Sequence, residues 1–285
     1  MATVKEDLGP GPEGRREARQ PAPSDTRPRA GWWRRAPGSV PGLARRHWIF
    51  GIALAVSLVP RVIVMLGYRP AVLFRMDSFD YLWNALHLSP NVINPSGYSF
   101  FLWILKPLHS LVLVAALQHL MGLVIATVVY VILRRYNLPA WGATLAAAPT
   151  LFDPAQILVE QLIMADLLAT ALMVTAFAVL LLRESPSLWR SVTAAVLMGA
   201  SATVRPTTLP LVVLIPVYLL IRHAGWRRAA AALAAGALPV IAYAGWFDSA
   251  HGSFNLTNSN GLFLWSRTMS FADCSVIRPP ADLRP

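Results

Sequence analysis

The chain has 285 residues, of which 55% are hydrophobic and only 14% are charged. A soluble domain of this size needs a far more highly charged surface, so the composition excludes an ordinary soluble protein and indicates a membrane protein with several spans. The net charge of +11 does not indicate a nucleic-acid partner, because about ten of the Lys and Arg residues lie before Trp48 and most others lie in short gaps between apolar runs.

The N-terminal part combines a basic tail with a first apolar span. Residues 1–46 are rich in Pro, Gly, Arg and Ala, which predicts a disordered cytoplasmic tail rather than a signal peptide. The span follows at 47–68 and is long enough to cross ~30 Å of hydrocarbon. Arg61 falls in its outer third, where the side chain either snorkels to the interface, the interpretation we favour, or faces a polar cavity.

The segment 69–97 is expected to form the first loop on the outer side. It contains RMDSFDY, in which Asp77 and Asp80 lie three residues apart and close to Arg75. The apolar residues that follow, with Trp83 among them, fit a short amphipathic helix on the membrane surface. The next apolar run, 98–105, is too short to cross alone and is predicted to be an interfacial or re-entrant segment.

The remaining apolar runs predict an all-α, polytopic bundle of about seven spans. Every inferred inner gap is basic, which agrees with the positive-inside rule, and the inferred outer gaps hold Asp77, Asp80, Asp153, Asp248 and Asp273. The last segment, 248–285, lies outside in this topology, and we interpret it as the start of an outer domain that the chain does not complete. The six runs after the first are 110–133, 138–152, 157–182, 191–204, 209–221 and 229–247.

Polar groups gather on the predicted outer side. A carboxylate near an apolar surface, such as Asp77, can act as general base for a hydroxyl, and the neighbouring Arg75 can hold a phosphate; two solvated loop acids are the plainer interpretation. Glu160 and Asp166 lie in an apolar run, where carboxylates usually face a cavity or a partner. Arg205, at an outer helix end, either binds an anion such as a lipid phosphate or pairs with Asp77 or Glu160.

Several kinds of chemistry find no support in the sequence. It contains no Walker loop, no GxGxxG after a strand and no GxSxG elbow, which argues against a soluble, nucleotide-driven enzyme. His87, His109, His119 and His251 lack metal-ligand spacing. The single cysteine, Cys274, excludes an intrachain disulfide. A substrate delivered from the membrane fits the composition better.

The order of these motifs resembles the GT-C class of integral membrane glycosyltransferases, most of all the protein O-mannosyltransferase and aminoarabinose-transferase branch. The similarity covers about residues 48–247. It rests on Asp77 in the first outer loop, a P-x-G-Y-like motif at 95–98, a span ending in Arg134 and Arg135, and a helix that opens with acids. Asp-Ser-Phe-Asp replaces the adjacent Asp-Glu of the mannosyltransferases, which argues against protein O-mannosylation, and the later spans and completed outer domain of the class are lacking.

The resemblance implies an inverting transfer of a sugar from a polyprenyl phosphate to a hydroxyl of a glycan, lipid or protein, on the outer face of the cell membrane. Asp77 would be the catalytic base, and Arg75 or Arg205 would face the leaving phosphate. The pattern names no definite cofactor, but a divalent metal held by Asp77 with Glu160 or Asp166 would do similar work. A lipid or small-solute transporter and a non-catalytic assembly subunit are the alternative functions. The residues expected to bind substrate are Arg75, Asp80, Glu160, Asp166 and Arg205.

Overall fold

The computed structural model describes residues 40–183 and 186–273. The chain divides into a short N-terminal unit, Met1–Leu43, and a main unit, Ala44–Pro285, to which the following description applies. The described residues are all-α, as the sequence predicts, with eleven α-helices and no named strand. The predicted tail lies outside the described residues over 1–39, as does Cys274; positions 40–46, also assigned to the tail, belong to the first helix.

Three helices of the described part are long and apolar enough to cross a membrane: α1 (Val40–Gly67), α4 (Leu111–Arg135) and α10 (Trp226–His251). Four further apolar helices are shorter, with 11 to 17 residues. By length and composition the structure therefore identifies three candidate spans, where the sequence predicts about seven. The four shorter helices are α5 (Ala140–Phe152), α7 (Asp166–Leu181), α8 (Leu188–Val204) and α9 (Leu211–Ile221).

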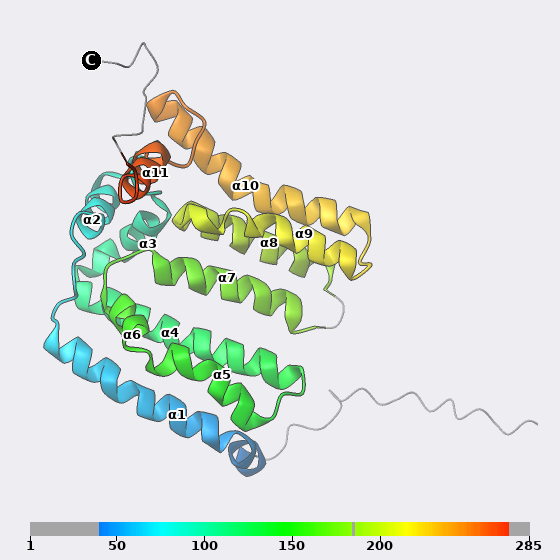
Figure 1. Ribbon diagram of the computed structural model, residues 1–285. Coiled ribbons are helices and arrows are strands. Elements are labelled where there is room, and N and C mark those ends of the chain that lie inside the picture. Colours follow the sequence, from blue (N-terminus) through cyan, green and yellow to red (C-terminus); the bar gives the residue numbers. More distant parts are fainter. Residues whose placement is uncertain (1–39, 184–185, 274–285) are drawn as a thin grey trace, which may run out of the picture. The chain divides into compact units, whose positions relative to one another are not determined.

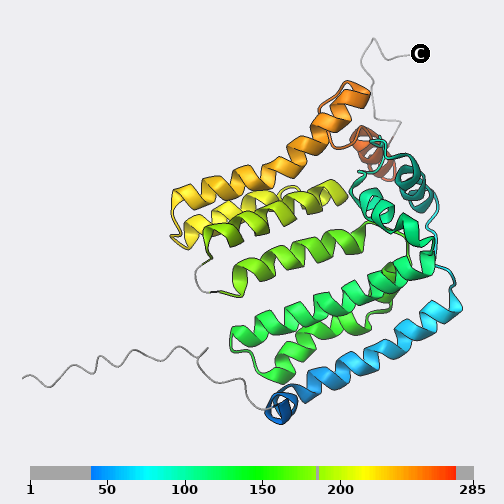
Figure 2. The ribbon, with the colours of Figure 1, turned by 180° about the vertical axis from the view of Figure 1, so that it is seen from behind.

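The helices pack through small residues. Helix α8 contacts α7, α9 and α10, and α4 contacts α5 and α7 (Figures 1 and 2). Gly199 of α8 leaves room for the backbone carbonyl of Gly236 on α10, so these two helices approach closely. A separate apolar cluster joins α1 to α4 and α5, in which Phe50 stacks on Tyr130 with 4.0 Å between ring centroids.

The direction of the helices brings several helix termini together at one end of the bundle. Helices α4, α5, α7, α8, α9 and α10 alternate in direction (Figure 1). The last residues of α1, α8 and α10 and the first residues of α4 and α7 consequently lie at the same end. This end, which we call the α2 end, also carries α2 (Asp77–His87), α3 (Gly97–Leu105) and α6 (Pro154–Gln161).

The predicted single span at 157–182 is wrong. The structure breaks it into α6 and α7, and Val72 forms a short parallel bridge with Leu162 in the gap. The side-chain amide of Gln118 on α4 donates to the backbone carbonyls of Glu160 and Leu162, at 2.9 and 2.7 Å. These bonds satisfy polar backbone groups that a helix would otherwise have satisfied, which explains how the break is tolerated among apolar helices.

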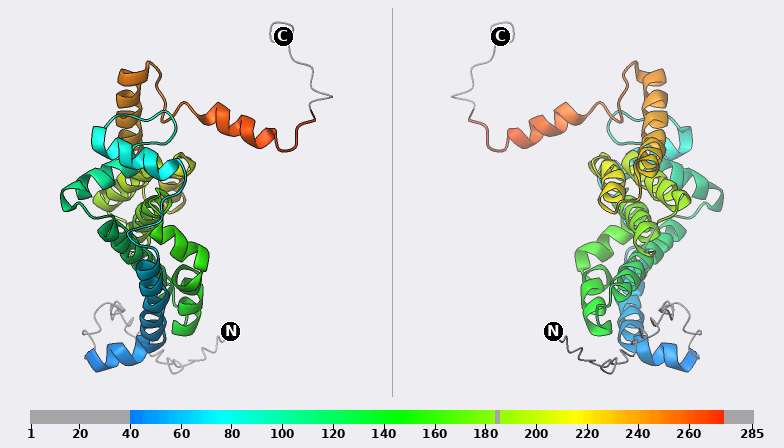
Figure 3. Two further views of the ribbon diagram at one scale, coloured as in Figure 1. Left: turned by 90° about the vertical axis from the view of Figure 1, so that its left-hand side faces the viewer. Right: turned by 90° about the vertical axis from the view of Figure 1, so that its right-hand side faces the viewer.

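Two short helices decide the shape of the α2 end. The helix predicted after the acidic motif is confirmed as α2, but it already begins at Asp77, so both aspartates lie in its first turn. A second helix, α11 (Asn260–Thr268), lies in the last segment, which we interpreted as the start of an outer domain. It exposes Leu262, Phe263 and Trp265, and the side views show it extending away from the bundle (Figure 3).

Candidate functional site

Helix α2 is held in place by bonds on both sides of the acidic motif. The hydroxyl of Ser78 accepts a hydrogen bond from the backbone N–H of Phe74 and donates to the carbonyl of Ile163, both at 2.8 Å. One turn later, the carbonyl of Tyr81 accepts from Ser99 of α3 at 3.0 Å. Because Ser78 is fully buried, the first turn of α2 is tied to the break between α6 and α7.

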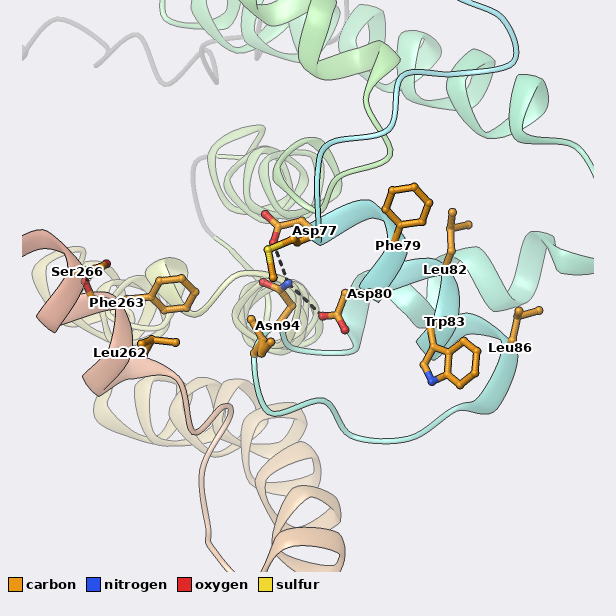
Figure 4. A pocket seen from close by; sticks show the side chains of 12 residues that line it. Asp77, Phe79, Asp80, Leu82, Trp83, Leu86, Asn94, Leu262, Phe263 and Ser266 are labelled. Atoms are coloured by element: carbon orange, nitrogen blue, oxygen red, sulfur yellow. Dashed lines mark hydrogen bonds between the residues drawn. The ribbon is translucent and has the colours of Figure 1, made fainter.

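The two aspartates of this turn share an asparagine. The side-chain amide of Asn94 donates to Asp77 Oδ1 and to Asp80 Oδ2, each at 3.2 Å (Figure 4). Asn91 donates to Asp80 Oδ1 at 2.5 Å. The cluster of Asn91, Asn94, Pro95 and Gly97 is typical of a turn, and the sequence assigned neither asparagine a role in the site. The structure gives them a second role, since they bridge and orient the carboxylates.

The carboxylates face a pocket of about 790 Å³. Its walls are mainly apolar and come from α2 and α11, so the pocket combines a polar side with apolar surroundings (Figure 4). Burial raises the pKa of Asp80 above its usual value, and the nearby charge of Asp77 adds to the shift, while hydrogen bonds from Asn94 and Asn91 oppose it. The lining residues are Met76, Asp77, Phe79, Asp80, Leu82, Trp83, Leu86, Ile93, Asn94, Leu262, Phe263 and Ser266.

Arg205 and Asp166 form an ion pair at the same end of the bundle. Arg205 follows the last residue of α8, and Asp166 is the first residue of α7. Burial alone would lower the pKa of Arg205. The hydrogen bond and the negative charge of Asp166 outweigh this effect and raise the pKa above its usual value, and the charge of Asp77 also raises it. The partner of Arg205 is therefore Asp166, and not Asp77 or Glu160 as one sequence interpretation held. Its Nε is buried and has no hydrogen-bond partner among the described residues.

Glu160 is paired with Arg61. Arg61 Nε donates to Glu160 Oε2 and Nη2 donates to Oε1, both at 2.8 Å, and the two side chains are 2% and 0% exposed. The preferred interpretation that Arg61 snorkels to the interface is thus wrong. The remaining donors of Arg61 bind the carbonyls of Ser57, Leu151 and Thr150 at 2.8 to 3.1 Å. All five guanidinium N–H groups are used.

The end of α5 explains why a cation is bound there. Pro154 has no N–H for the carbonyl of Thr150, and the N–H of Ala155 donates instead to the side chain of Asp153 at 2.8 Å. The carbonyls of Thr150 and Leu151 are thus left without the usual helical donors. Arg61 supplies hydrogen bonds to both, and its charge is favourable at a helix C-terminus.

The pairing of Glu160 keeps it away from Asp77. Besides Arg61, its carboxylate contacts His119 Nδ1 at 2.8 Å and Gln156 at 3.2 Å. Gly122 of α4 packs directly against it. Within the described residues Asp77 is not among its partners, so the expected joint metal site of Asp77 and Glu160 is not formed, and the fully buried carboxylate does not reach the pocket as a substrate ligand.

A metal also does not fit between the two aspartates as they stand. No group of three His, Cys, Asp or Glu side chains with metal-binding geometry occurs in the described part of the chain. The amide nitrogen of Asn94, which is a donor, lies between the carboxylates of Asp77 and Asp80. A cation would need an oxygen ligand at that position.

The structure thus separates the predicted site residues into three sets and the isolated Arg75. Asp77 and Asp80 share the pocket, and Asp166 with Arg205 forms a second pair at the same end of the bundle. Glu160 belongs to the Arg61 cluster. Arg75 precedes α2 and is exposed, without an ion pair to another described residue. Comparison of the chain with protein-family models, with curated proteins and with solved structures gives no match.

Proposed function

We propose that this protein transfers a sugar from a polyprenyl-phosphate donor to an acceptor hydroxyl, with Asp77 as the general base. The observation that carries the proposal is the position of Asp77 in the first turn of α2, on the polar side of a pocket of about 790 Å³ with apolar walls. A pocket of this size and polarity fits a substrate with a polar head and an apolar chain. The resemblance of the motif order to membrane glycosyltransferases supplies the reaction type.

We further propose a membrane arrangement in which α1, α4, α5, α7, α8, α9 and α10 all cross and the α2 end faces outward. Basic residues support it, because Arg134 and Arg135 end α4, Arg183 follows α7 and Arg190 lies near the start of α8, all away from the α2 end. The shortest of these helices would extend only ~17 Å at 1.5 Å per residue. It therefore needs a locally thinned bilayer or a protein lining.

The proposed reaction uses the residues of the α2 end. A carboxylate oxygen of Asp77 takes the proton of the acceptor hydroxyl while the hydroxyl oxygen bonds to the anomeric carbon. The bond from that carbon to the phosphate oxygen breaks, and the lipid phosphate leaves with the electron pair, so the configuration inverts. Negative charge grows on the phosphate. Arg205, which is oriented by Asp166 and whose Nε has no hydrogen-bond partner among the described residues, is our candidate for stabilising that charge.

A lipid or solute transporter is the second candidate. The break between α6 and α7 favours it, because discontinuous helices at a polar site also occur in transporters. To separate the two functions, the full chain would be placed in vesicles and supplied with a panel of polyprenyl-phosphate sugars and hydroxyl acceptors. Formation of a glycosylated acceptor supports the enzyme. Movement of lipid or solute without any new glycosidic bond supports the transporter, and neither activity would favour an assembly subunit.

A further inference from the structure

A second pocket, of about 390 Å³, lies on the same short helix as the first. It is walled by leucines and other apolar residues of α2, α3 and the beginning of α4. Leu82 and Leu86 line both pockets, so α2 separates them. In contrast to the pocket at Asp77, this one has no carboxylate in its lining.

The edge of the second pocket is positive. It is formed by Lys106, His109 and Ser110, in the turn between α3 and α4. Lys106 and His109 are exposed, and neither side chain forms an ion pair with a described acid. The edge also adjoins the N-terminus of α4, where Ser110 caps the helix by accepting from the N–H of Leu113 at 3.2 Å. The positive end of that helix dipole acts together with the charge of Lys106.

We propose that this pocket binds one anionic phospholipid of the surrounding bilayer. The phosphate would lie at Lys106 and His109, and part of an acyl chain would occupy the space between Leu86, Leu102 and Leu105. Charge complementarity supports this occupant, because a lipid with a single phosphate needs a cationic edge and an apolar interior, and both are present. The inference rests on the membrane placement proposed above but not on sugar transfer.

A lipid bound in this pocket would also contact the helix that lines the first pocket. Lysine binds phosphate as a flexible point charge, so the headgroup contact does not need a rigid fork. The acyl chain would pack against the face of α2 opposite the carboxylates. A lipid in this pocket would then support the shared wall of Leu82 and Leu86.

Binding to the full chain in detergent would be measured with dioleoyl phosphatidylglycerol, using retention in native mass spectrometry and a titrated thermal shift. Dioleoyl phosphatidylcholine is the probe with matched chains, and glycerol phosphate is the probe with a matched headgroup. We expect phosphatidylglycerol to bind about tenfold more tightly than phosphatidylcholine, a preference typical of one or two charge contacts. Glycerol phosphate alone should not be retained.

Variants locate the site. Lys106→Gln should remove most of the preference for phosphatidylglycerol, and His109→Asn should weaken it while suiting the left-handed backbone at φ 46°. Arg190→Gln, which removes one positive charge near the start of α8, should leave it unchanged. Binding of phosphatidylglycerol that is no tighter than that of phosphatidylcholine, or that is equal in Lys106→Gln, would overturn the proposal. Displacement by equimolar polyprenyl phosphate would overturn the assignment to a phospholipid. None of these measurements depends on sugar transfer, so they test lipid binding separately from the proposed activity.

Discussion

Arg61 on α1 and Glu160 on α6 lie 99 residues apart in the chain and form a doubly hydrogen-bonded, buried ion pair. The pair joins α1 to the end of α5 and to α6. From Glu160 the chain runs directly into the break before α7, whose Ile163 carbonyl holds Ser78 in the first turn of α2. The ion pair and the candidate base therefore belong to one connected framework.

Removing one partner of this ion pair should strongly destabilise the folded protein. Either Arg61→Met or Glu160→Met leaves a buried group without its partner, so each should lower the free energy of unfolding by about 3–5 kcal/mol. The double variant Arg61→Met/Glu160→Met leaves no unpaired charge and should be less destabilised than the sum of the single variants. Thermal unfolding in detergent would measure all three. Strictly additive losses would show that the two residues do not interact.

The close approach of α4 to Glu160 gives a second prediction. A methyl group at Gly122 would overlap the Glu160 carboxylate, so Gly122→Ala should destabilise the protein by about 1–3 kcal/mol through overpacking. At Gly51 of α1 a methyl group meets no atom within 4 Å. Gly51→Ala should therefore be neutral or stabilising by up to about 1 kcal/mol. Equal unfolding temperatures for the two variants would contradict the packing at Gly122.

The two hydrogen bonds of Ser78 are predicted to hold Asp77 in position. Ser78→Ala removes the donor to Ile163 and the acceptor for the N–H of Phe74, at a cost of about 1–3 kcal/mol for unsatisfied buried groups. The variant should lower kcat more than it raises KM, because Asp77 remains but is less well held. Ser249→Ala, at an exposed position of α10, is the control. An unchanged kcat in Ser78→Ala would show that this anchor does not position the base.

Asp80 should make stability depend on pH. Burial raises the pKa of Asp80 in the folded protein, so the folded state holds this proton more tightly than the unfolded state. Protonated Asp80 therefore stabilises the fold fully at a pH below 3.8, the ordinary pKa of an aspartate. This stabilisation is lost as the pH rises through the higher pKa that Asp80 has in the folded protein. Relative to Asp80→Asn, the wild type should thus lose thermal stability across that window. A constant difference between the two at all pH values would contradict this prediction.

The apolar pattern predicted most helices but not the break at 162–165. A run such as 110–133 gave α4 to within two residues because length and composition decide where a long apolar helix lies. The break depends on Gln118 and Val72, which are distant in sequence and supply the hydrogen bonds that replace helical ones. Gln161 and Asp166 inside the apolar run were the available signal, since neither is typical of a continuous span.

The candidate site was predictable in part. The acidic motif placed Asp77 and Asp80 in a loop before a short helix at an apolar surface, and the structure puts both into the first turn of that helix and into one pocket. The pairing of carboxylates with arginines was not predictable, because Arg61 and Glu160 are brought together only by the packing of α1 against α5. Helix α11 was missed because its apolar residues, Leu262 to Trp265, form one run of four that is too short to show a helical repeat.

Asp77→Asn tests the central claim most directly. The exchange keeps the size of the side chain but removes the proposed base, so sugar transfer by the full chain in membranes should fall about 10²–10⁴-fold. Asp248→Asn, at an exposed carboxylate near the end of α10, is the matched control and should transfer at the wild-type rate. Loss of transfer in Asp77→Asn alone, at equal abundance and unfolding temperature, is the result we predict. Full activity of Asp77→Asn would contradict its assignment as the base.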